Sequence, residues 1–539
     1  MRTDFGQIDY IIFAVYAIGI IALGLWMSRT KKGHERTSQD YFLAGRSLPW
    51  WAIGATCIAA NISAEQLIGM TGSGFVMGIA MASYEFASAF ILIFIGKYFL
   101  PIYIKNNIST MPQFLELRYN RNVRSGLAFY LLLIYIFVNL TSILYLGAFA
   151  IEAIMGLKFE YALIGLALFA AIYSIYGGLG AVAWTDIIQV GILLIGGFLT
   201  TYIALDLISA GDGVIAGAKK LFEVAPEKFH MIFSKGHENY QTLPGLGVII
   251  GVLFVANTFY WGFNQYTIQR ALAGKSIRAA QHGVMFAGYL KLIMPILVVV
   301  PGIAAFVMLS DPEILAKIGS INPAEVPSIE HADRAYTWLL GLLPQGIKGL
   351  AFAALIAAIV ASLASKINSA ATIFTVDIYK PFLNKDATEK RMVFVGRLAA
   401  TISLILGLIV APSLRSLSQA FQYIQEFTGF VSPGIVAIFL LGMFWKRTTT
   451  KAAIWMAFVT LPISLIFYFL IPEIPFLIRM GYSCFIIMGT GIFVSMLSKQ
   501  KVDIKAIPLE KGIFNTSLIF KIASILIFIL LAIFYWIFW

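Results

Sequence analysis

Amide and hydroxyl side chains interrupt two apolar segments of this chain, residues 58–74 and 254–266. The first reads IAANISAEQLIGMTGSG and the second reads FVANTFYWGFNQY. A backbone group without a hydrogen bond is costly inside a bilayer, so a broken membrane helix is tolerated only where it faces protein or a water-filled cavity. Two such segments in different halves of a chain are typical of a transporter's central binding site. The alternative is that each is a polar seam between packed helices.

Charged side chains also lie deep within apolar segments. Glu85 and Lys291 are near the middle of predicted spans, where a charge costs about 2.5–3.5 kcal/mol on insertion scales. Ser88 follows Glu85 by three residues and shares its helix face. We expect Glu85 to accept hydrogen bonds from a ligand, and Lys291 to pair with Glu85 or to donate to a polar ligand. Asp186 follows a tight GGLG turn and is either a cation site near the cytoplasm or a helix N-terminal charge.

A set of amide side chains falls inside predicted spans and includes both broken segments. One amide often joins two helices, but such a set indicates a polar cavity. Amides both donate and accept, which suits neutral ligands rich in hydroxyl groups. Tyr260 and Trp261 could stack on the apolar side of a sugar ring, although ordinary packing also explains them. The amides are Asn61, Gln66, Asn139, Asn257, Asn264, Gln422 and Gln425.

Small residues recur at helical spacing in residues 353–369, AALIAAIVASLASKINS. Ala358, Ser362 and Ser365 share one face of this predicted helix. Small residues let another helix approach closely, and serine oxygens can coordinate a hard cation. Close packing alone is the alternative explanation.

Composition identifies an integral membrane protein. The chain has 539 residues, of which 60% are hydrophobic and 12% charged, whereas a soluble domain carries about 25% charged residues. Cys57 and Cys484 lie in apolar runs and indicate neither a disulfide framework nor a metal site. The net charge of +12 comes from short loops between apolar runs, so it is a topology signal and not a nucleic-acid footprint.

About fourteen apolar segments are long enough to cross a bilayer. Every second loop is basic, which predicts that both termini lie on the outer side of the plasma membrane. Basic residues follow the first apolar run instead of preceding it, so a membrane anchor fits better than a cleavable signal peptide. The spans are 9–28, 48–72, 76–104, 125–154, 159–178, 181–207, 244–269, 280–309, 347–379, 393–412, 417–444, 452–471, 476–497 and 516–538.

Several long strings give the chain its family resemblance. It resembles the solute:sodium symporters, most closely the bacterial sodium/galactose type, over nearly its whole length, and this resemblance implies a location in the inner membrane of a bacterium. The resemblance implies an all-α membrane protein with a five-plus-five inverted-repeat core, of the leucine-transporter type, in residues 48–444. The first and sixth core helices would be broken at mid-membrane, with 9–28 before the core and 452–538 after it. The strings include YFLAGRSLPWWAIGA, AANISAEQLIGM, ASYEF, YIFVNLTSILYLG, YSIYGGLGAVAWTDIIQV, YWGFNQYTIQR, SLASKINSAATIFTVDIYK and AFQYIQEFTGFVSPGI.

The resemblance also implies roles for individual residues. The implied sugar contacts are Gln66, Glu85, Ser88, Asn139, Asn257, Tyr260, Lys291 and Gln425. Tyr260 would form an inner gate held by Asn61, and the outer gate would be Met70, Tyr135 and Phe421. The implied sodium ligands are backbone carbonyls of Ala59, Ile62 and Ala358 with the Ser362 hydroxyl, and Asp186 would lie on the sodium exit path. Sodium is the expected coupling ion, and no cofactor is expected.

Two residues depart from the pattern of the similar symporters. Ala361 replaces a serine, which removes one hydroxyl ligand and implies weaker sodium binding or replacement by a water or carbonyl. Lys366 lies one turn beyond Ser362 on nearly the same helix face, where a cation would repel sodium. One alternative is that the Lys366 side chain turns toward the cytoplasmic end.

We therefore expect sodium-coupled symport of a galactose- or glucose-like monosaccharide by alternating access. Glu85 offsets the charge of Lys291, which favours a neutral polyol over a carboxylate. A symporter for another small solute is the nearest alternative. A cation channel would need a continuous polar path, and the expected gate residues are bulky. An enzyme is not expected, since the chain has no HExxH motif and its histidines are dispersed.

Overall fold

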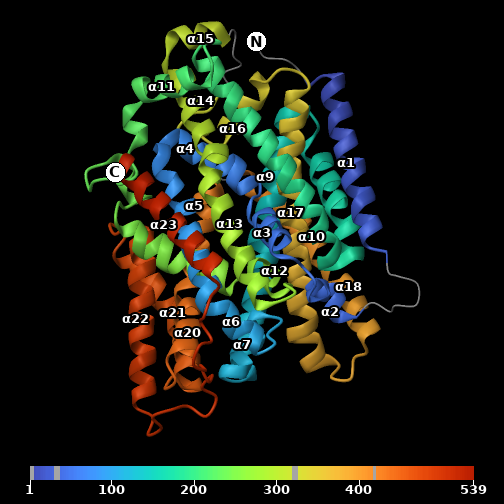
Figure 1. The fold of residues 1–539 in the computed structure, drawn as a ribbon, viewed down its shortest axis with the longest axis vertical. Coiled ribbons are helices and arrows are strands. Elements are labelled where there is room, and N and C mark those ends of the chain that lie inside the picture. Colours follow the sequence, from blue (N-terminus) through green and yellow to red (C-terminus); the bar gives the residue numbers. More distant parts are fainter. Residues whose placement is uncertain (1–4, 30–36, 319–325, 417–419) are drawn as a thin grey trace.

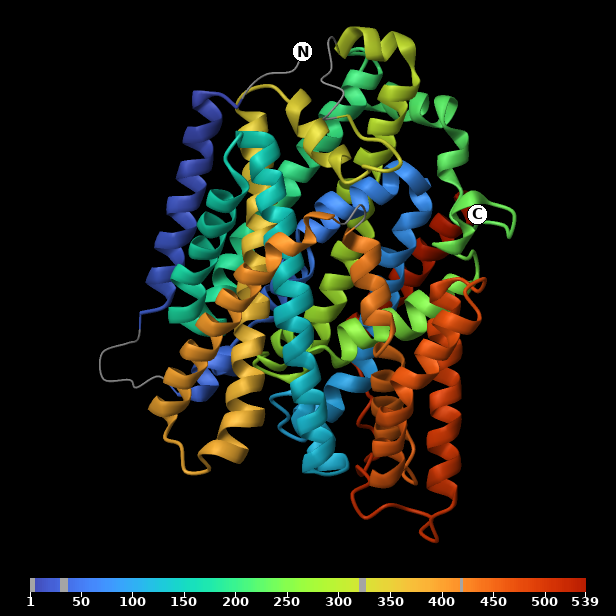
Figure 2. The same cartoon turned by 180° about the vertical axis from the view of Figure 1, so that it is seen from behind.

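The computed structural model describes residues 5–29, 37–318, 326–416 and 420–539 as a tall bundle of helices (Figure 1). Seen from behind, the segment between residues 111 and 155 runs through the middle of the bundle, with the last helices of the chain beside it (Figure 2). Within the described residues there is no β-strand, and one isolated bridge joins Leu48 to Gly274. The predicted all-α class is confirmed.

The first half of the chain contains the first broken segment and a long kinked helix. Its elements are α1 (Gln7–Met27), α2 (Ser38–Leu43), η1 (Ala44–Arg46), α3 (Trp50–Asn61), η2 (Glu65–Met70), α4 (Thr71–Met77), η3 (Gly78–Ala82), α5 (Ser83–Phe94), η4 (Ile95–Phe99), α6 (Leu100–Lys105), α7 (Met111–Arg118), α8 (Arg121–Ile134), η5 (Tyr135–Leu140), α9 (Thr141–Met155) and α10 (Phe159–Ile208).

The second half contains the second broken segment and the helices that flank the bundle. Its elements are α11 (Val214–Val224), η6 (Pro226–Phe229), η7 (Glu238–Gln241), η8 (Ile249–Asn257), η9 (Phe259–Phe263), α12 (Gln265–Leu272), α13 (Ile277–Val298), α14 (Val300–Ser310), α15 (Pro312–Ile318), α16 (Arg334–Leu342), α17 (Ile347–Ile373), η11 (Phe374–Leu383), α18 (Glu389–Val410), η12 (Ala411–Ser416), α19 (Ala420–Gly429), α20 (Ser432–Phe444), α21 (Thr450–Leu470), α22 (Phe476–Met496) and α23 (Leu518–Ile537).

Ten helical segments of the described chain are long and apolar enough to cross a membrane, and two shorter apolar helices accompany them. One of the ten, α10, covers two predicted spans, 159–178 and 181–207. Its kink is at Gly178, whose φ of 65° and ψ of −163° are not helical. A Cβ atom there would come within 2.5 Å of the Tyr41 carbonyl oxygen, so both the backbone angle and the close approach require glycine. The predicted count of fourteen spans stays a prediction.

Both segments predicted to be broken are broken in the structure. Helix α3 ends at Asn61, where Ile62 turns extended with φ −73° and ψ 123°, and helical structure resumes at η2. In the second segment, Asn264 is extended between η9 and α12. The described part of the predicted span 417–444 is also interrupted, since α19 ends at Gly429 and α20 begins at Ser432.

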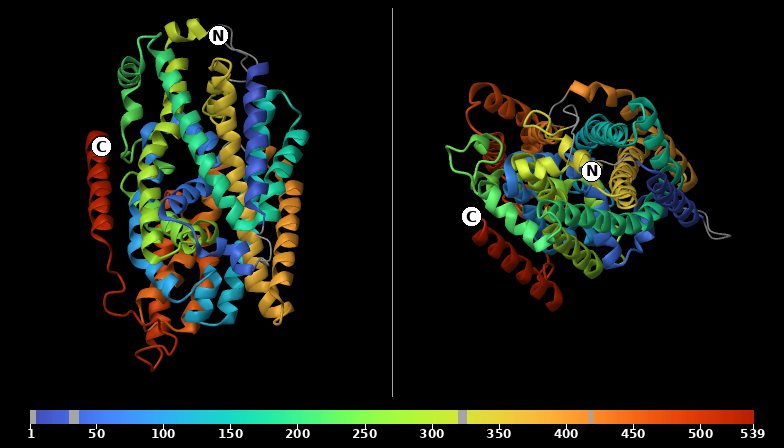
Figure 3. Two further views of the ribbon diagram at one scale, coloured as in Figure 1. Left: turned by 45° about the vertical axis from the view of Figure 1, so that its right-hand side comes forward. Right: turned by 90° about the horizontal axis from the view of Figure 1, so that it is seen from above.

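Burial distinguishes the inner helices from the outer ones. Every residue of α17 from Ala351 to Ile373 is buried, and α3 packs against α10, α12, α13 and α17. By contrast, α23 buries one stripe, Phe520, Ser524, Ile527 and Leu531, against α5 and α13. It stands at the flank of the bundle (Figure 3), and most of its other apolar side chains are exposed. Such a helix fits a lipid-facing position.

Candidate functional site

The two broken segments line one cavity, whose empty space of about 910 Å³ includes the part open to solvent. Residues of η2, α5, η5, η8, η9, α19 and α22 meet there, so the polar side chains of both halves of the chain face a common space. The residues that had been predicted for the site and that line the cavity are Asn61, Gln66, Met70, Glu85, Ser88, Asn139, Asn257, Tyr260, Asn264 and Gln425.

Glu85 and Lys291 form a buried ion pair beside this cavity. The Lys291 Nζ atom donates to Glu85 Oε2 over 2.5 Å, and it lies 5.5 Å from the Trp261 ring centroid. Glu85 lines the cavity, whereas Lys291 lies behind it and does not. The pair brings a carboxylate to the cavity wall without a net charge, since the opposite charge is within hydrogen-bond distance.

Ser88 and Asn257 join the wall formed by α5 to that formed by η8. The Ser88 Oγ atom lies 2.6 Å from Asn257 Oδ1 and 2.9 Å from the Tyr84 carbonyl. The Asn257 Nδ2 atom donates to the Val252 carbonyl over 3.1 Å, a group left available by the irregular helix around it. These two residues therefore already bond one another across the cavity wall.

Asn61 bonds Tyr260 at the point where both broken segments meet. The Asn61 Nδ2 atom donates to Tyr260 Oη over 2.8 Å. The Asn61 Oδ1 atom is buried and has no partner among the described residues. Asn61 therefore fixes the hydroxyl of Tyr260, as expected if Tyr260 forms an inner gate held by Asn61.

The start of η2 presents both an amide and a carboxylate. The Gln66 Oε1 atom accepts hydrogen bonds from Ser63 N and Ser63 Oγ, both at 2.9 Å. Glu65 accepts from Ser142 Oγ over 2.6 Å. Nearby on η5, the buried Asn139 Oδ1 atom has no partner within the described chain. This side of the cavity is thus rich in oxygen acceptors.

Of the three residues expected at an outer gate, Met70 and Tyr135 do not line the cavity together. Met70 is buried and lines the cavity. Tyr135 instead contacts the second break, where its hydroxyl donates to Asn264 Oδ1 and accepts from Gln265 N over 2.8 Å. It does not line the cavity, although its neighbour Ile134 does. The backbone of Phe421 is in α19, but its side chain lies outside the described residues.

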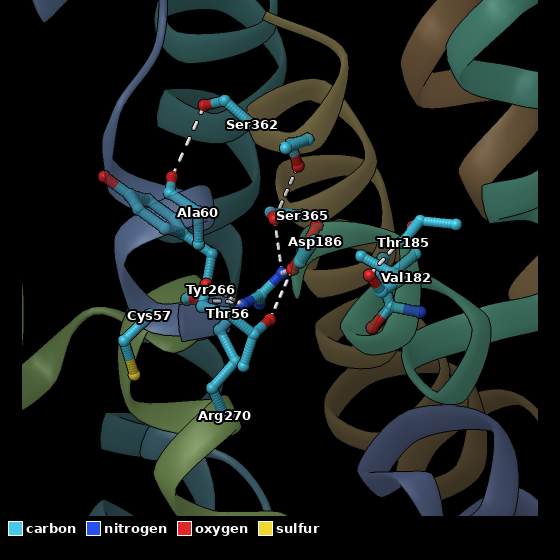
Figure 4. Close-up of polar contacts among 12 residues, drawn as sticks. Thr56, Cys57, Ala60, Val182, Thr185, Asp186, Tyr266, Arg270, Ser362 and Ser365 are labelled. Atoms are coloured by element: carbon cyan, nitrogen blue, oxygen red, sulfur yellow. Dashed lines mark hydrogen bonds and ion pairs between the residues drawn. The ribbon is translucent and has the colours of Figure 1, made fainter. Parts of the chain in front are cut away.

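A polar cluster holds α3, α10, α12 and α17 together (Figure 4). Asp186 accepts from Thr56 Oγ1, and its Oδ2 lies 3.6 Å from Arg270 Nη2. Arg270 also donates to Ser365 Oγ and, over 3.2 Å, to the Thr56 carbonyl. All four side chains are completely buried. Asp186, which was expected on a sodium exit path, is therefore paired with Arg270 in this structure.

The groups expected to bind sodium lie where α3 ends beside α17. The Ser362 Oγ atom is 3.4 Å from the Ala60 carbonyl (Figure 4). The carbonyls of Ala59 and Ile62 belong to the same break, and Ala358 and Ala361 lie on the adjoining turns of α17. Oxygen atoms of this kind suit a hard cation.

A lysine ammonium already lies on these oxygen atoms. The Lys366 Nζ atom is 2.6 Å from Ser362 Oγ and 3.5 Å from the Ala60 carbonyl. The side chain therefore turns back toward Ser362 and not toward the opposite end of α17, which was the alternative. While the ammonium is bound to these oxygen atoms, they do not accommodate a sodium ion in addition.

Sequence reasoning missed two charged residues of this region. Glu65 lines the cavity, and its position directly before Gln66 in a polar break was the signal that could have found it. Arg270 follows an apolar run, as the basic residues of the loops do, but it is fully buried against Asp186. Gln269 is also buried, and its Nε2 atom donates to Phe42 O and to Asn368 Oδ1. The polar cluster therefore extends along α12.

Comparisons with known proteins identify similar sodium-coupled transporters over most of the chain. Residues 41–459 match the model of the Sodium:solute symporter family. A sodium/glucose cotransporter of Vibrio parahaemolyticus is 52% identical over 99% of this chain and 98% of its own length. The human sodium/myo-inositol cotransporter 2 is 34% identical over 83% of this chain and 67% of its own. The mouse sodium/glucose cotransporter 1 is 33% identical over 83% and 69%.

Two solved structures share the fold. A substrate-bound, outward-open Na⁺-coupled sialic acid symporter has a TM-score of 0.80 at 22% identity and covers 93% of this chain and 100% of its own. A nucleobase-cation-symport-1 family transporter in a closed conformation has a TM-score of 0.55 at 13% identity, over 86% and 97%. These likenesses confirm the predicted fold class, an all-α transporter with its core helices broken at the centre.

Proposed function

This chain belongs to the sodium:solute symporter family, and we propose that it carries a galactose- or glucose-like monosaccharide into the cell together with sodium. It is a multi-pass membrane transporter and not an enzyme. The observation that carries the proposal is the cavity shared by both broken helices, where amides, a hydroxyl and a paired carboxylate face one space. The 52% identity of this chain with a sodium/glucose cotransporter supports the same substrate class.

The chemistry of the cavity suits a neutral molecule with many hydroxyl groups. Glu85 accepts hydrogen bonds but is neutralised by Lys291, so an anionic substrate would meet no uncompensated cation there. Asn257 and Ser88 now satisfy one another, and a sugar hydroxyl can exchange with either because both groups donate and accept. Gln66, Asn139 and Gln425 add amides around the same space. We assign the sugar contacts to these residues.

Alternating access requires a barrier on each side of the sugar. We assign the inner barrier to Tyr260, fixed by Asn61, and the outer barrier to Met70 with Phe421. Tyr135 is better placed to hold the second break, because it bonds Asn264 and the first backbone N–H of α12. We assign it a positioning role there.

The driving force is sufficient with one sodium ion per cycle. One charge that crosses a potential of 100 mV supplies about 2.3 kcal/mol, and a tenfold sodium gradient adds about 1.4 kcal/mol. The sum of about 3.7 kcal/mol sustains a sugar gradient of about 500-fold. A single coupling site is enough.

The orientation in the membrane follows from the basic loops. We place both termini outside, as the alternation of basic loops favours. Helix α1 begins and α23 ends toward the same end of the bundle (Figure 1), which supports a common side for both termini.

Uptake by purified protein in liposomes tests the proposed substrate class. Labelled galactose, glucose and fucose are supplied with an inward sodium gradient, and labelled proline, sialic acid and myo-inositol are supplied in parallel assays under the same gradient. We expect sodium-dependent uptake of at least one hexose. Uptake of proline or sialic acid but of no hexose would instead identify a symporter for another solute.

A further inference from the structure

The end of α3 is a place that attracts a positive charge. The last carbonyls of a helix have no intrahelical donors, and the C-terminal end of a helix carries a partial negative charge. Because α3 ends at Asn61 within the protein interior, these carbonyls cannot turn to bulk water. The Ile58 carbonyl is satisfied by Ile62 N over 2.8 Å, which leaves the carbonyls that follow it available to a cation.

The side chain of Lys366 brings a positive charge to this point. It is 1% exposed, and its ammonium contacts Ser362 Oγ and the Ala60 carbonyl at 2.6 and 3.5 Å. The ring of Tyr266 lies 4.5 Å from Nζ, a distance typical of a cation–π contact. An alcohol oxygen, a helix-end carbonyl and an aromatic face thus surround the ammonium.

Within the part of the chain that the structure describes, no acidic side chain lies within ion-pair distance of Lys366 Nζ. Two charged groups act on it electrostatically: Glu65 of η2 attracts the ammonium, and Arg270 of α12 repels it. Glu65 bonds Ser142, and Arg270 is paired with Asp186. The ammonium is therefore held by neutral dipoles, as a bound alkali ion would be.

We propose that Lys366 is a tethered cation that competes with sodium for the site at the end of α3. This inference rests on the proposed function, because it concerns the coupling ion of the same transporter. Sodium at Ser362 and the ammonium at Ser362 would share one oxygen atom, and two positive charges so close repel each other strongly. Sodium then binds there only when the Lys366 side chain has moved away, so the lysine lowers the apparent affinity for sodium.

Binding of ²²Na⁺ to the purified full-length chain tests this inference without any sugar. The variants are Lys366→Met and Lys366→Gln, which both remove the charge. Lys348→Met is the matched control, because Lys348 is another buried lysine of α17 that bonds the Gly341 carbonyl and lies far from the break. Size-exclusion profiles and melting temperatures establish that each variant is folded.

Removal of the charge is expected to lower the half-saturating sodium concentration by about tenfold or more, equivalent to about 1.4 kcal/mol. The control is expected to stay within about twofold of the parent chain, since a remote charge is not in competition. Equal sodium affinity in the parent and in every folded Lys366 variant would overturn the inference, and so would absence of sodium binding in all of them. If Lys366→Met binds sodium more tightly but no variant transports a hexose, the proposed substrate is wrong and the inference stands.

Discussion

Asn61 Nδ2 lies 2.8 Å from Tyr260 Oη, and this hydrogen bond joins the two broken segments of the fold. Asn61 is the last residue of α3, and Tyr260 lies in η9, a few residues before the second break. One bond thus connects the ends of elements that lie about 200 positions apart in the sequence. A substitution of Asn61 or of Tyr260 is therefore expected to affect both broken segments.

Tyr260→Phe is expected to weaken the inner gate while it keeps the ring. The lost bond is worth about 0.5–1.5 kcal/mol, which shifts the opening equilibrium about two- to tenfold. Efflux of labelled sugar from preloaded liposomes without sodium should rise by that factor. Tyr130→Phe is the matched control, because the buried Tyr130 hydroxyl has no partner in the described chain. Equal efflux from the two variants would contradict the gate assignment.

Gln66→Ala is expected to reduce sugar uptake about tenfold or more at low sugar concentration. Loss of a buried hydrogen-bonding group that meets the ligand costs about 1–3 kcal/mol. The measurement is the initial rate of sodium-driven uptake, normalised to the amount of folded protein. Gln281→Ala serves as the control, since Gln281 is buried on α13 and does not line the cavity. If the two variants take up sugar equally well, Gln66 makes no sugar contact.

Lys291→Met is expected to destabilise the protein because it leaves the Glu85 carboxylate buried without its partner. Breaking a buried ion pair on one side costs about 3–5 kcal/mol. The double variant Glu85→Gln with Lys291→Met should recover most of the loss in melting temperature but should not recover uptake. Additive destabilisation in the double variant would mean that the two side chains do not act as a pair.

Ser362→Ala is expected to raise the sodium concentration that gives half-maximal uptake by about two- to tenfold, since one hydroxyl ligand contributes about 0.5–1.5 kcal/mol. The control is Ser174→Ala, whose hydroxyl bonds only within its own helix, to the Ala170 carbonyl. Unchanged sodium dependence in Ser362→Ala would place the coupling ion elsewhere.

Much of the cavity was accessible to sequence reasoning because polar side chains stand out inside apolar segments. Gln66, Glu85 and Asn257 could be singled out for this reason, and they face one cavity. Their partners could not be derived in the same way. That Lys291 lies behind Glu85 depends on how α13 packs on α5, which no periodicity encodes.

The direction in which a long side chain points could not be predicted from the sequence. Arg270 follows an apolar run as loop cations do, and only the tertiary structure turns it inward to Asp186. Lys366 and Ser362 share a helix face at a spacing of four residues, yet a lysine can reach either way along a helix. The structure directs it to the end of α3.

A sodium-driven overshoot of labelled galactose in sealed liposomes tests the central claim most directly. Liposomes that contain the purified protein and potassium buffer are diluted into sodium buffer with the sugar. The account predicts a transient internal sugar level several times the final plateau, and no overshoot when potassium replaces sodium outside. A simple rise to the same plateau in both buffers would contradict sodium-coupled symport.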